Sequence, residues 1–207
     1  MLISDEQAFV FIHVPKTGGS SVGAALQPLC SLRNHGRLGA WLRPLGRPRD
    51  YHRFGFKRHD PLTVVERHMP APLFARFFKF AFVRNPWDRL VSEYNSVLCL
   101  PDHRRHARVR ALGGFKAYLR REAPFVLATQ RRLLVDSTGE IGADFVGRFE
   151  RLEQDFGSVC QRLGIEAALP HLNRHEHGDY RSYYDDEARE LVRSHWGEDI
   201  VAFDYEF

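Results

Sequence analysis

One short segment combines glycine, hydroxyl and basic side chains in an order that suits the binding of an anion. Residues 15–21 read Pro-Lys-Thr-Gly-Gly-Ser-Ser and follow an apolar run, Phe9-Val10-Phe11-Ile12. Two consecutive glycines allow a tight turn that points several N–H groups at one place. A helix after the turn would add its positive end. The pattern therefore predicts a cradle for a phosphate-like group, with Lys16 as a mobile charge.

A second segment, Arg84-Asn85-Pro86-Trp87-Asp88-Arg89, follows another apolar run and predicts a second anion site. Pro86 suits the first turn of a helix, so Arg84 would lie at its start and Ser92 about two turns further along. P-loop kinases commonly end such a strand in an aspartate that helps hold Mg²⁺, and here a cation stands in that place. The first segment also differs from a Walker A loop, because Lys16 precedes the glycines.

Two anion sites at two strand–helix junctions, without an evident acid for a metal, predict a substrate with two separate anionic ends. 3′-Phosphoadenosine 5′-phosphosulfate, PAPS, has a phosphosulfate at one end and a 3′-phosphate at the other, and it fits this description.

The pattern of apolar residues predicts an α/β fold in a single domain over residues 1–207, with a central parallel sheet flanked by helices. The predicted strands are 7–14, 78–84 and 144–149. The predicted helices are 21–26, 61–76 with a break near Pro70, 86–97, 114–122, 150–163 and 185–196. On the last helix Ala188, Leu191, Val192 and His195 would share one side. Residues 31–58 lack periodicity and predict a long basic loop.

Composition narrows the class of protein. The formal net charge is only +4, but eight Lys/Arg against one acid lie between Arg33 and Arg58, and residues 103–110 form a second basic cluster. Such clusters suit an anionic partner or are solvated surface. Cys30, Cys99 and Cys160 are widely spaced and are expected to be buried small residues. Without a long apolar run or a basic leader, we expect a soluble, cytoplasmic protein.

Residues 14–21 resemble the 5′-phosphosulfate loop of PAPS-dependent sulfotransferases, and residues 82–94 resemble their 3′-phosphate segment. The closest resemblance is to the carbohydrate branch, sulfotransferase family 2. Residues 144–150, 169–173, 184–185 and 199–207 also resemble family segments, so the similarity covers most of the chain. It is weakest over 31–58 and 99–130, where family members differ in acceptor.

The resemblance implies a P-loop-NTPase-like sulfotransferase fold, with PAPS as donor and PAP as product. It places around the 5′ end of the donor Lys16, Thr17, Gly18, Gly19, Ser20 and Ser21. Arg84 and Ser92 would bind the 3′-phosphate, and Arg148 is a candidate for the adenine side. Lys16 would also stabilise charge on the leaving phosphate oxygen.

A general base is needed to take the proton of the acceptor hydroxyl. His59 is the first choice, because related carbohydrate sulfotransferases resemble this chain in placing a histidine between the two phosphate motifs. His13, His52 and His68 are the alternatives, and His13 is interpreted as structural.

The expected partners are PAPS and a hydroxyl-bearing acceptor, a glycan or glycolipid, with no nucleic acid and no required metal. Residues 171–177 contain three histidines, but their spacing gives no convincing third metal ligand. Two other classes of function remain open, a P-loop-type nucleotide kinase and a non-enzymatic polyanion-binding protein. A sulfotransferase acting on a small metabolite or lipid would differ in acceptor alone. The sequence leaves open the acceptor, the hydroxyl attacked and the oligomeric state.

Overall fold

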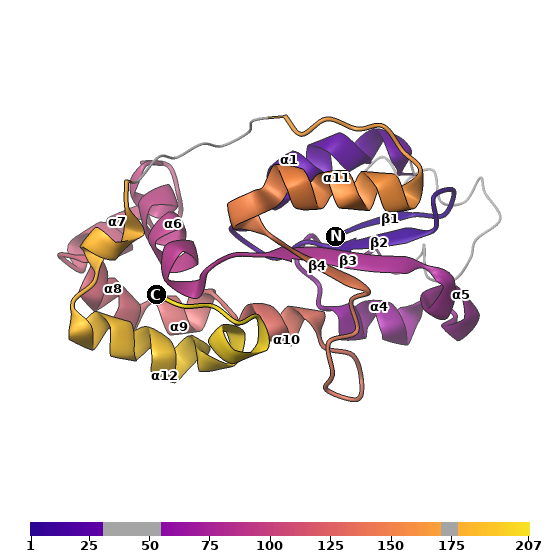
Figure 1. Ribbon diagram of the computed structural model, residues 1–207. Helices are drawn as coiled ribbons and strands as arrows, with labels where there is room; N and C mark the ends of the chain where they lie inside the picture. The colour runs from indigo at the N-terminus through magenta and orange to yellow at the C-terminus, as the bar shows by residue number, and fades with distance from the viewer. Residues whose placement is uncertain (31–54, 171–177) are drawn as a thin grey trace. The chain divides into compact units, whose positions relative to one another are not determined.

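The computed structural model describes residues 1–30, 55–170 and 178–207 (Figure 1). These residues form two compact units. The first consists of Met1–Val83 and Arg132–Leu172, and the second of Arg84–Arg131 and Asn173–Phe207. The expectation of a single domain over the whole chain stays a prediction. Most of the basic loop, together with His52 and the histidine-rich stretch 171–177, lies outside the described residues.

A four-stranded sheet forms the centre of the first unit, in the order β1-β2-β3-β4. The strands are β1 Leu2–Ser4, β2 Phe9–Ile12, β3 Phe78–Val83 and β4 Phe145–Arg148. β2 pairs with β3 and β3 with β4, both in parallel, which confirms the predicted α/β class. β1 pairs with β2 in the antiparallel sense and was not predicted, because three residues carry too little periodicity.

The inner strands are buried along almost their whole length because helices cover both faces of the sheet, and Lys79 in β3 is their one charged residue. Figure 1 shows α1 (Gly19–Leu26) and α11 (Leu152–Leu163) on one face and α4 (Leu62–His68) on the other. Between α4 and β3 in the sequence lies α5 (Ala71–Arg76). Two short 3₁₀ helices, η1 (Gln27–Leu29) and η4 (Phe149–Arg151), also belong to the described part of this unit. The predicted helix 61–76 is therefore two helices, separated near Pro70 as expected.

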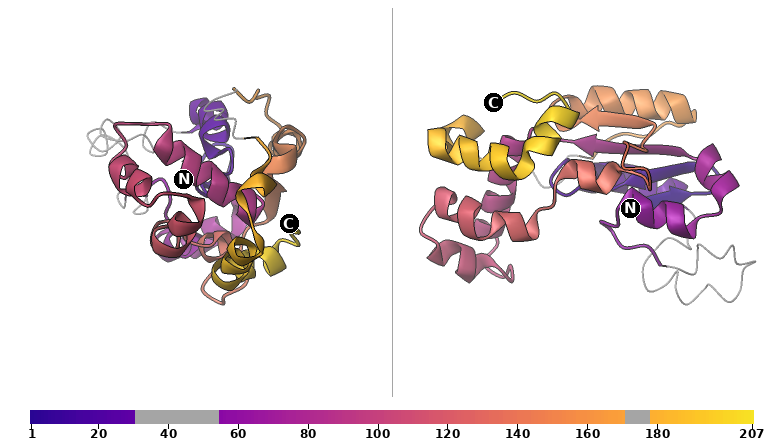
Figure 2. Two further views of the ribbon diagram at one scale, coloured as in Figure 1. Left: turned by 90° about the vertical axis from the view of Figure 1, so that its left-hand side faces the viewer. Right: turned by 90° about the horizontal axis from the view of Figure 1, so that it is seen from below.

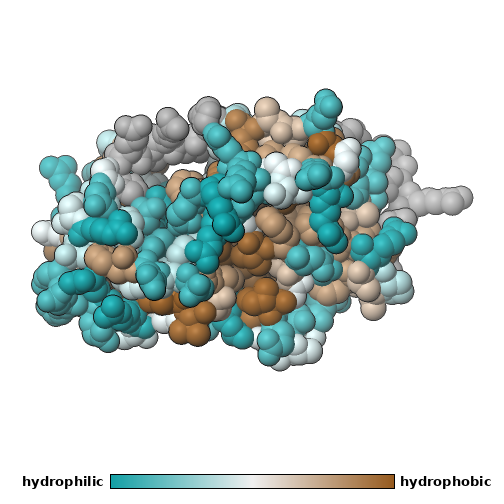
Figure 3. Space-filling view, in the orientation of Figure 1, coloured by the Kyte–Doolittle hydropathy of each residue, from teal (hydrophilic) through white to brown (hydrophobic). Residues whose placement is uncertain are grey.

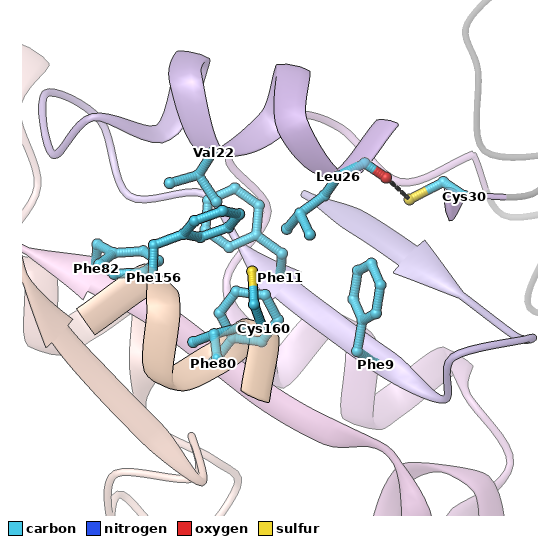
Figure 4. Close-up of a cluster of buried hydrophobic side chains, with 10 residues drawn as sticks. Phe9, Phe11, Val22, Leu26, Cys30, Phe80, Phe82, Phe156 and Cys160 are labelled. Carbon is cyan, nitrogen blue, oxygen red and sulfur yellow. Dashed lines mark hydrogen bonds between the residues drawn. The ribbon is translucent and has the colours of Figure 1, made fainter. Parts of the chain in front are cut away.

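Aromatic rings fill the space between the sheet and the pair α1 and α11 (Figure 4). Phe9, Phe11, Phe80 and Phe82 alternate along β2 and β3 and are fully buried. The rings of Phe11 and Phe80 stack with centroids 5.3 Å apart. Burial of one such ring contributes about 1.5–3 kcal/mol, so this cluster fixes the position at which β2 leaves the sheet.

The second unit is helical. Its helices are α6 Pro86–Leu98, α7 His106–Ala111, α8 Phe115–Arg121, α9 Ala123–Val126, the start of α10 Gln130–Leu134, η5 Tyr180–Tyr183 and α12 Asp186–Ala202. α12 packs against α6 and α8 (Figure 2). Its buried residues are Ala188, Val192, Trp196 and Asp199, whereas His195 is exposed. The predicted face was therefore wrong at His195. The helix is kinked at Trp196, where φ is −122° and ψ is 20°, and Trp196 is buried whereas His195 is not.

The surface agrees only in part with the sequence-based expectations. The face seen in Figure 3 is mostly hydrophilic, with a smaller group of hydrophobic residues. In the second basic cluster, Arg105 pairs with Glu93 and Arg108 pairs with Glu122, so part of its charge is neutralised internally. Cys30 and Cys160 are buried as expected, but Cys99 is exposed at the end of α6. No helix among the described residues is long and apolar enough to cross a membrane.

Candidate active site

The glycine-rich segment is a loop that joins the end of β2 to the start of α1, as predicted. Lys16 has a φ of +69° and Gly18 a φ of +76°, so the chain turns twice through left-handed geometry before the helix. Thr17 is buried, and its hydroxyl donates to the carbonyl of Val14 at 3.0 Å. The Thr17 hydroxyl thus braces the turn from inside.

Each of the two central glycines is required by a different neighbour. Gly18 is left-handed, and a Cβ there would lie 2.6 Å from Leu152 Cδ2. A Cβ on Gly19 would overlap Cδ2 and Nε2 of His13 and would lie 3.0 Å from Cε1 of that ring. The loop is therefore pressed between the start of α11 and the His13 imidazole, and its backbone follows a single path.

The start of α1 has the character of an anion site. Gly18 is the N-cap and has no side chain to bond to the helix. Its carbonyl accepts from the N–H groups of Ser21 at 3.0 Å and Val22 at 3.2 Å, which closes the first turn. Helix geometry gives the earlier N–H groups no acceptor inside the helix, and the helix dipole adds partial positive charge there. A bound anion would accept hydrogen bonds from these N–H groups and would be attracted by the partial positive charge.

A turn at residues 57–60 lies beside this loop. The Lys57 N–H donates to Asp60 Oδ2 at 2.7 Å, which holds the turn. From it Arg58 Nη2 donates to Ser20 Oγ at 2.8 Å, and Arg58 Nε donates to His13 Nδ1 at 3.2 Å. Sequence reasoning missed Arg58, since it was one of eight basic residues in an aperiodic segment. Its position next to His59 was the one available signal.

His59, the predicted base, lies against the same histidine. Its Nδ1 is 2.8 Å from the His13 carbonyl oxygen, and the two rings meet edge to face with centroids 4.8 Å apart. The His59 side chain is exposed, whereas the His13 side chain is buried. Burial, followed by electrostatic repulsion from the N-terminal amine, Arg58 and His59, lowers the pKa of His13 to about 2. His13 is therefore a neutral imidazole at physiological pH.

The second predicted segment begins the helical unit. Arg84 is buried, and its Nε donates to Asp88 Oδ2 at 2.7 Å, one helical turn ahead. Its backbone N–H donates to Gln130 Oε1 at 2.9 Å, and its carbonyl accepts from Gln130 Nε2 at 2.8 Å. These bonds fix the residue at the start of α6. Ser92 lies two turns further along that helix and is half-buried.

Asn85 explains why α6 begins where it does. Its Oδ1 accepts from the Trp87 N–H at 3.0 Å and caps the helix, while Pro86 occupies the first turn. The Asn85 amide also donates to the Glu206 carbonyl at 2.8 Å, so the end of the chain closes on the helix start. The sequence predicted this helix start from Pro86 but not the contact with Glu206.

Arg148 and His68, the remaining described candidates, both belong to the first unit. Arg148 is the last residue of β4, in the same unit as the loop, and its N–H donates to Asp155 Oδ2 at 2.6 Å. His68 lies at the end of α4. Among residues 1–30, 55–170 and 178–207, no group of three or more His, Cys, Asp or Glu is arranged to hold a metal ion.

Comparison with known proteins matches both units to one family. A scan against protein-family models matches residues 1–206 to the sulfotransferase family, in its family 2 form. A search of curated proteins gave no match. The matched range includes the glycine loop, Arg84 and the C-terminal helix, so the match does not depend on a single motif. The chain therefore belongs to the sulfotransferase family, whose members are PAPS-dependent transferases.

Proposed function

We propose that the protein transfers the sulfuryl group of PAPS to a hydroxyl of a carbohydrate or glycoconjugate. The observation that carries this proposal is the set of donors around the start of α1. They are the first N–H groups of the helix, the Ser20 hydroxyl and the Arg58 guanidinium. This set fits a phosphosulfate, which is anionic and accepts hydrogen bonds. The carbohydrate acceptor rests on the resemblance to that branch of the family.

The two ends of the donor are assigned to the two predicted segments. Residues 16–21 would hold the 5′-phosphosulfate, and Arg84 with Ser92 would hold the 3′-phosphate. Asp88 supports the second assignment, because its bond to Nε orients the Arg84 guanidinium. Arg148 is proposed for the adenine side, and no metal is assigned a role.

Lys16 is proposed to stabilise the charge that develops on the leaving phosphate oxygen. Its backbone is left-handed, and it lies within the turn, two residues before Gly18. Sulfuryl transfer needs the attacking and leaving oxygens in line and a fixed cation near the leaving oxygen.

His59 is proposed as the general base, and its hydrogen bond supports this role. A backbone carbonyl can only accept, so the bond to the His13 carbonyl requires the His59 proton on Nδ1. In the neutral ring Nε2 then carries the lone pair that can accept a proton from a hydroxyl. The edge-to-face contact with His13 holds the ring beside the loop.

The test combines binding and turnover. We expect calorimetry to detect binding of adenosine 3′,5′-bisphosphate, PAP, in the absence of a divalent ion. Sulfur-labelled PAPS should label at least one acceptor in a panel of glycans, lipids and small alcohols. Binding of ATP–Mg²⁺ without PAP would favour a kinase, and salt-sensitive polyanion binding without PAP would favour a binding protein.

Alanine substitutions of His59 and Lys16 test the roles proposed for these two side chains. We expect His59→Ala to bind PAP normally and to lose about 10²–10⁴-fold in turnover. Lys16→Ala should lose turnover as well. A His59→Ala protein with normal turnover would remove His59 as the base while leaving the sulfotransferase activity intact. Labelling of lipids or small alcohols without any glycan would overturn the carbohydrate acceptor.

A further inference from the structure

We propose that Arg58 is a positioning residue that fixes Ser20 and His13 as hydrogen-bond donors, and that His13 binds the 5′-phosphosulfate through Nε2–H. This inference rests on the proposed function. It adds His13 to the donor site and gives Arg58, already one of its donors, the further role of orienting two neighbours.

The guanidinium group of Arg58 bonds to two neighbours, Ser20 and His13. Arginine has five N–H donors, accepts no hydrogen bond and stays charged in proteins. Arg58 Nη2 lies 2.8 Å from Ser20 Oγ, so the serine oxygen accepts that bond. The hydroxyl hydrogen of Ser20 must then point elsewhere, and it can be donated to a second acceptor. Arg58 therefore turns an ambivalent hydroxyl into a donor at the start of α1.

The same guanidinium decides the tautomer of His13. Arg58 Nε donates to His13 Nδ1 at 3.2 Å, so Nδ1 carries a lone pair rather than a proton. The low pKa of His13 keeps the ring neutral. A neutral imidazole holds one proton, which must then be on Nε2. His13 is thus a donor through Nε2 and has no charge.

The Nε2 atom lies at the helix start. A Cβ built on Gly19, the first residue of α1, would overlap His13 Nε2 and Cδ2. This nitrogen is therefore a neighbour of the N–H groups that begin the helix. Stacking on Phe11, with centroids 5.7 Å apart, holds the ring in this position from the core side. Nε2–H, the Ser20 hydroxyl and the helix N–H groups together present hydrogens to one anion.

His59 has the opposite tautomer, because its Nδ1 bonds to an acceptor, whereas the Nδ1 of His13 bonds to a donor. The His13 carbonyl requires the proton of His59 on Nδ1, whereas Arg58 requires the proton of His13 on Nε2. Two histidines in ring contact are therefore assigned different chemical roles. His13 donates a hydrogen bond to the donor nucleotide, and His59 accepts the proton of the attacking hydroxyl.

Nuclear magnetic resonance tests the tautomers without any ligand. Long-range ¹H–¹⁵N correlation spectra of protein labelled in histidine distinguish Nδ1–H from Nε2–H rings. We expect His13 to be a neutral Nε2–H ring at pH 7. Arg58→Ala should leave His59 unchanged and allow His13 to populate the Nδ1–H form. A His13 ring that is charged, or that is Nδ1–H in the unaltered protein, overturns the inference.

Binding of PAP, measured by calorimetry, tests the consequence. A hydrogen bond to a charged group is worth about 1.5–3 kcal/mol, so Arg58→Ala should weaken PAP binding by about 10- to 100-fold. Arg67→Ala, which removes an exposed arginine on α4, is the control of equal charge and should leave binding unchanged. Arg58 is exposed, and its removal opens no core cavity, so the variant is expected to fold.

A pair of His13 variants identifies the nitrogen that binds. The amide nitrogen of glutamine can occupy the place of Nε2, whereas that of asparagine reaches only the place of Nδ1. We expect His13→Gln to bind PAP within about threefold of the unaltered protein and His13→Asn to bind at least about tenfold more weakly. Equal PAP binding by Arg58→Ala and Arg67→Ala overturns the inference and leaves the proposed function standing. Failure of the unaltered protein to bind PAP overturns both.

Discussion

Replacement of Gly19 by alanine tests how tightly the loop is built. The added Cβ would lie inside van der Waals contact with two atoms of the His13 ring. That ring has little room to move, because it stacks on Phe11, accepts from Arg58 and contacts His59. The backbone of Gly19 is helical, so the methyl group itself meets no conformational penalty.

Gly23 is the matched control, four residues further along the same helix. A Cβ there meets no atom within 4 Å. Alanine in place of glycine inside a helix should stabilise the protein by about 0.5–1 kcal/mol. Overpacking of a rigid site costs about 1–3 kcal/mol. We therefore expect Gly23→Ala to raise the free energy of unfolding and Gly19→Ala to lower it.

Urea unfolding, followed by tryptophan fluorescence, measures both changes. The same Gly19→Ala substitution in a His13→Ala protein makes the test specific, because that protein lacks the ring that the methyl group would contact. In that background Gly19→Ala should cost less by about 1–3 kcal/mol, a coupling expected only of residues in contact. Equal effects of Gly19→Ala with and without the ring, or a Gly19→Ala protein as stable as Gly23→Ala, would refute the reasoning.

Three further predictions concern stability. The pKa of His13 is about 2 in the folded protein and about 6.5 in the unfolded chain, so at pH 5 only the unfolded chain takes up a proton at this residue. The free energy of unfolding should therefore be full above pH 6.5 and lower by about 2 kcal/mol at pH 5. Urea unfolding at both pH values should show this loss, and His13→Gln should lack it. Asp199→Ala should lower the free energy of unfolding by about 3–5 kcal/mol, because it removes the carboxylate that lies 3.8 Å from the fully buried Arg89 guanidinium. A loss under about 1 kcal/mol would contradict this prediction. Gly18→Ala should cost at least about 1 kcal/mol by the same measurement, since φ is +76° and Leu152 lies in the way, and unchanged stability would count against the left-handed turn.

Sequence patterns predicted the parts of the fold that depend on short, continuous stretches of chain. The continuous apolar run Phe9–Ile12 identified β2, mostly apolar segments identified β3 and β4, and the glycine turn identified the junction of β2 with α1. Helix ends were found where a residue type marks them, as Gly164 does with its φ of +64° at the end of α11. α7 and α9 were missed because short helices held by tertiary packing give little periodic signal.

The site was less predictable than the fold, because its most informative contacts join distant residues. The bond from Arg58 to His13 spans 45 positions, and that from Asn85 to Glu206 spans 121. A single sequence shows which residues could donate or accept, but not which of them meet. His13 illustrates the limit. Interpretation as a structural residue accounts for its burial, but the two bonds that relate it to the site depend on a segment that carries no pattern.

The position of His13 explains how the core and the candidate site are connected. β2 is buried along its whole length, and its last ring before the loop, Phe11, stacks on His13. The ring of His13 then accepts from Arg58, and its carbonyl accepts from His59. One residue at the end of a rigid strand thus orients both the cation at the loop and the proposed base. If only the glycines fixed the loop, Arg58 and His59 would have to be reoriented for each turnover. Because both side chains are bonded to a residue at the end of a buried strand, they keep their orientation between turnovers.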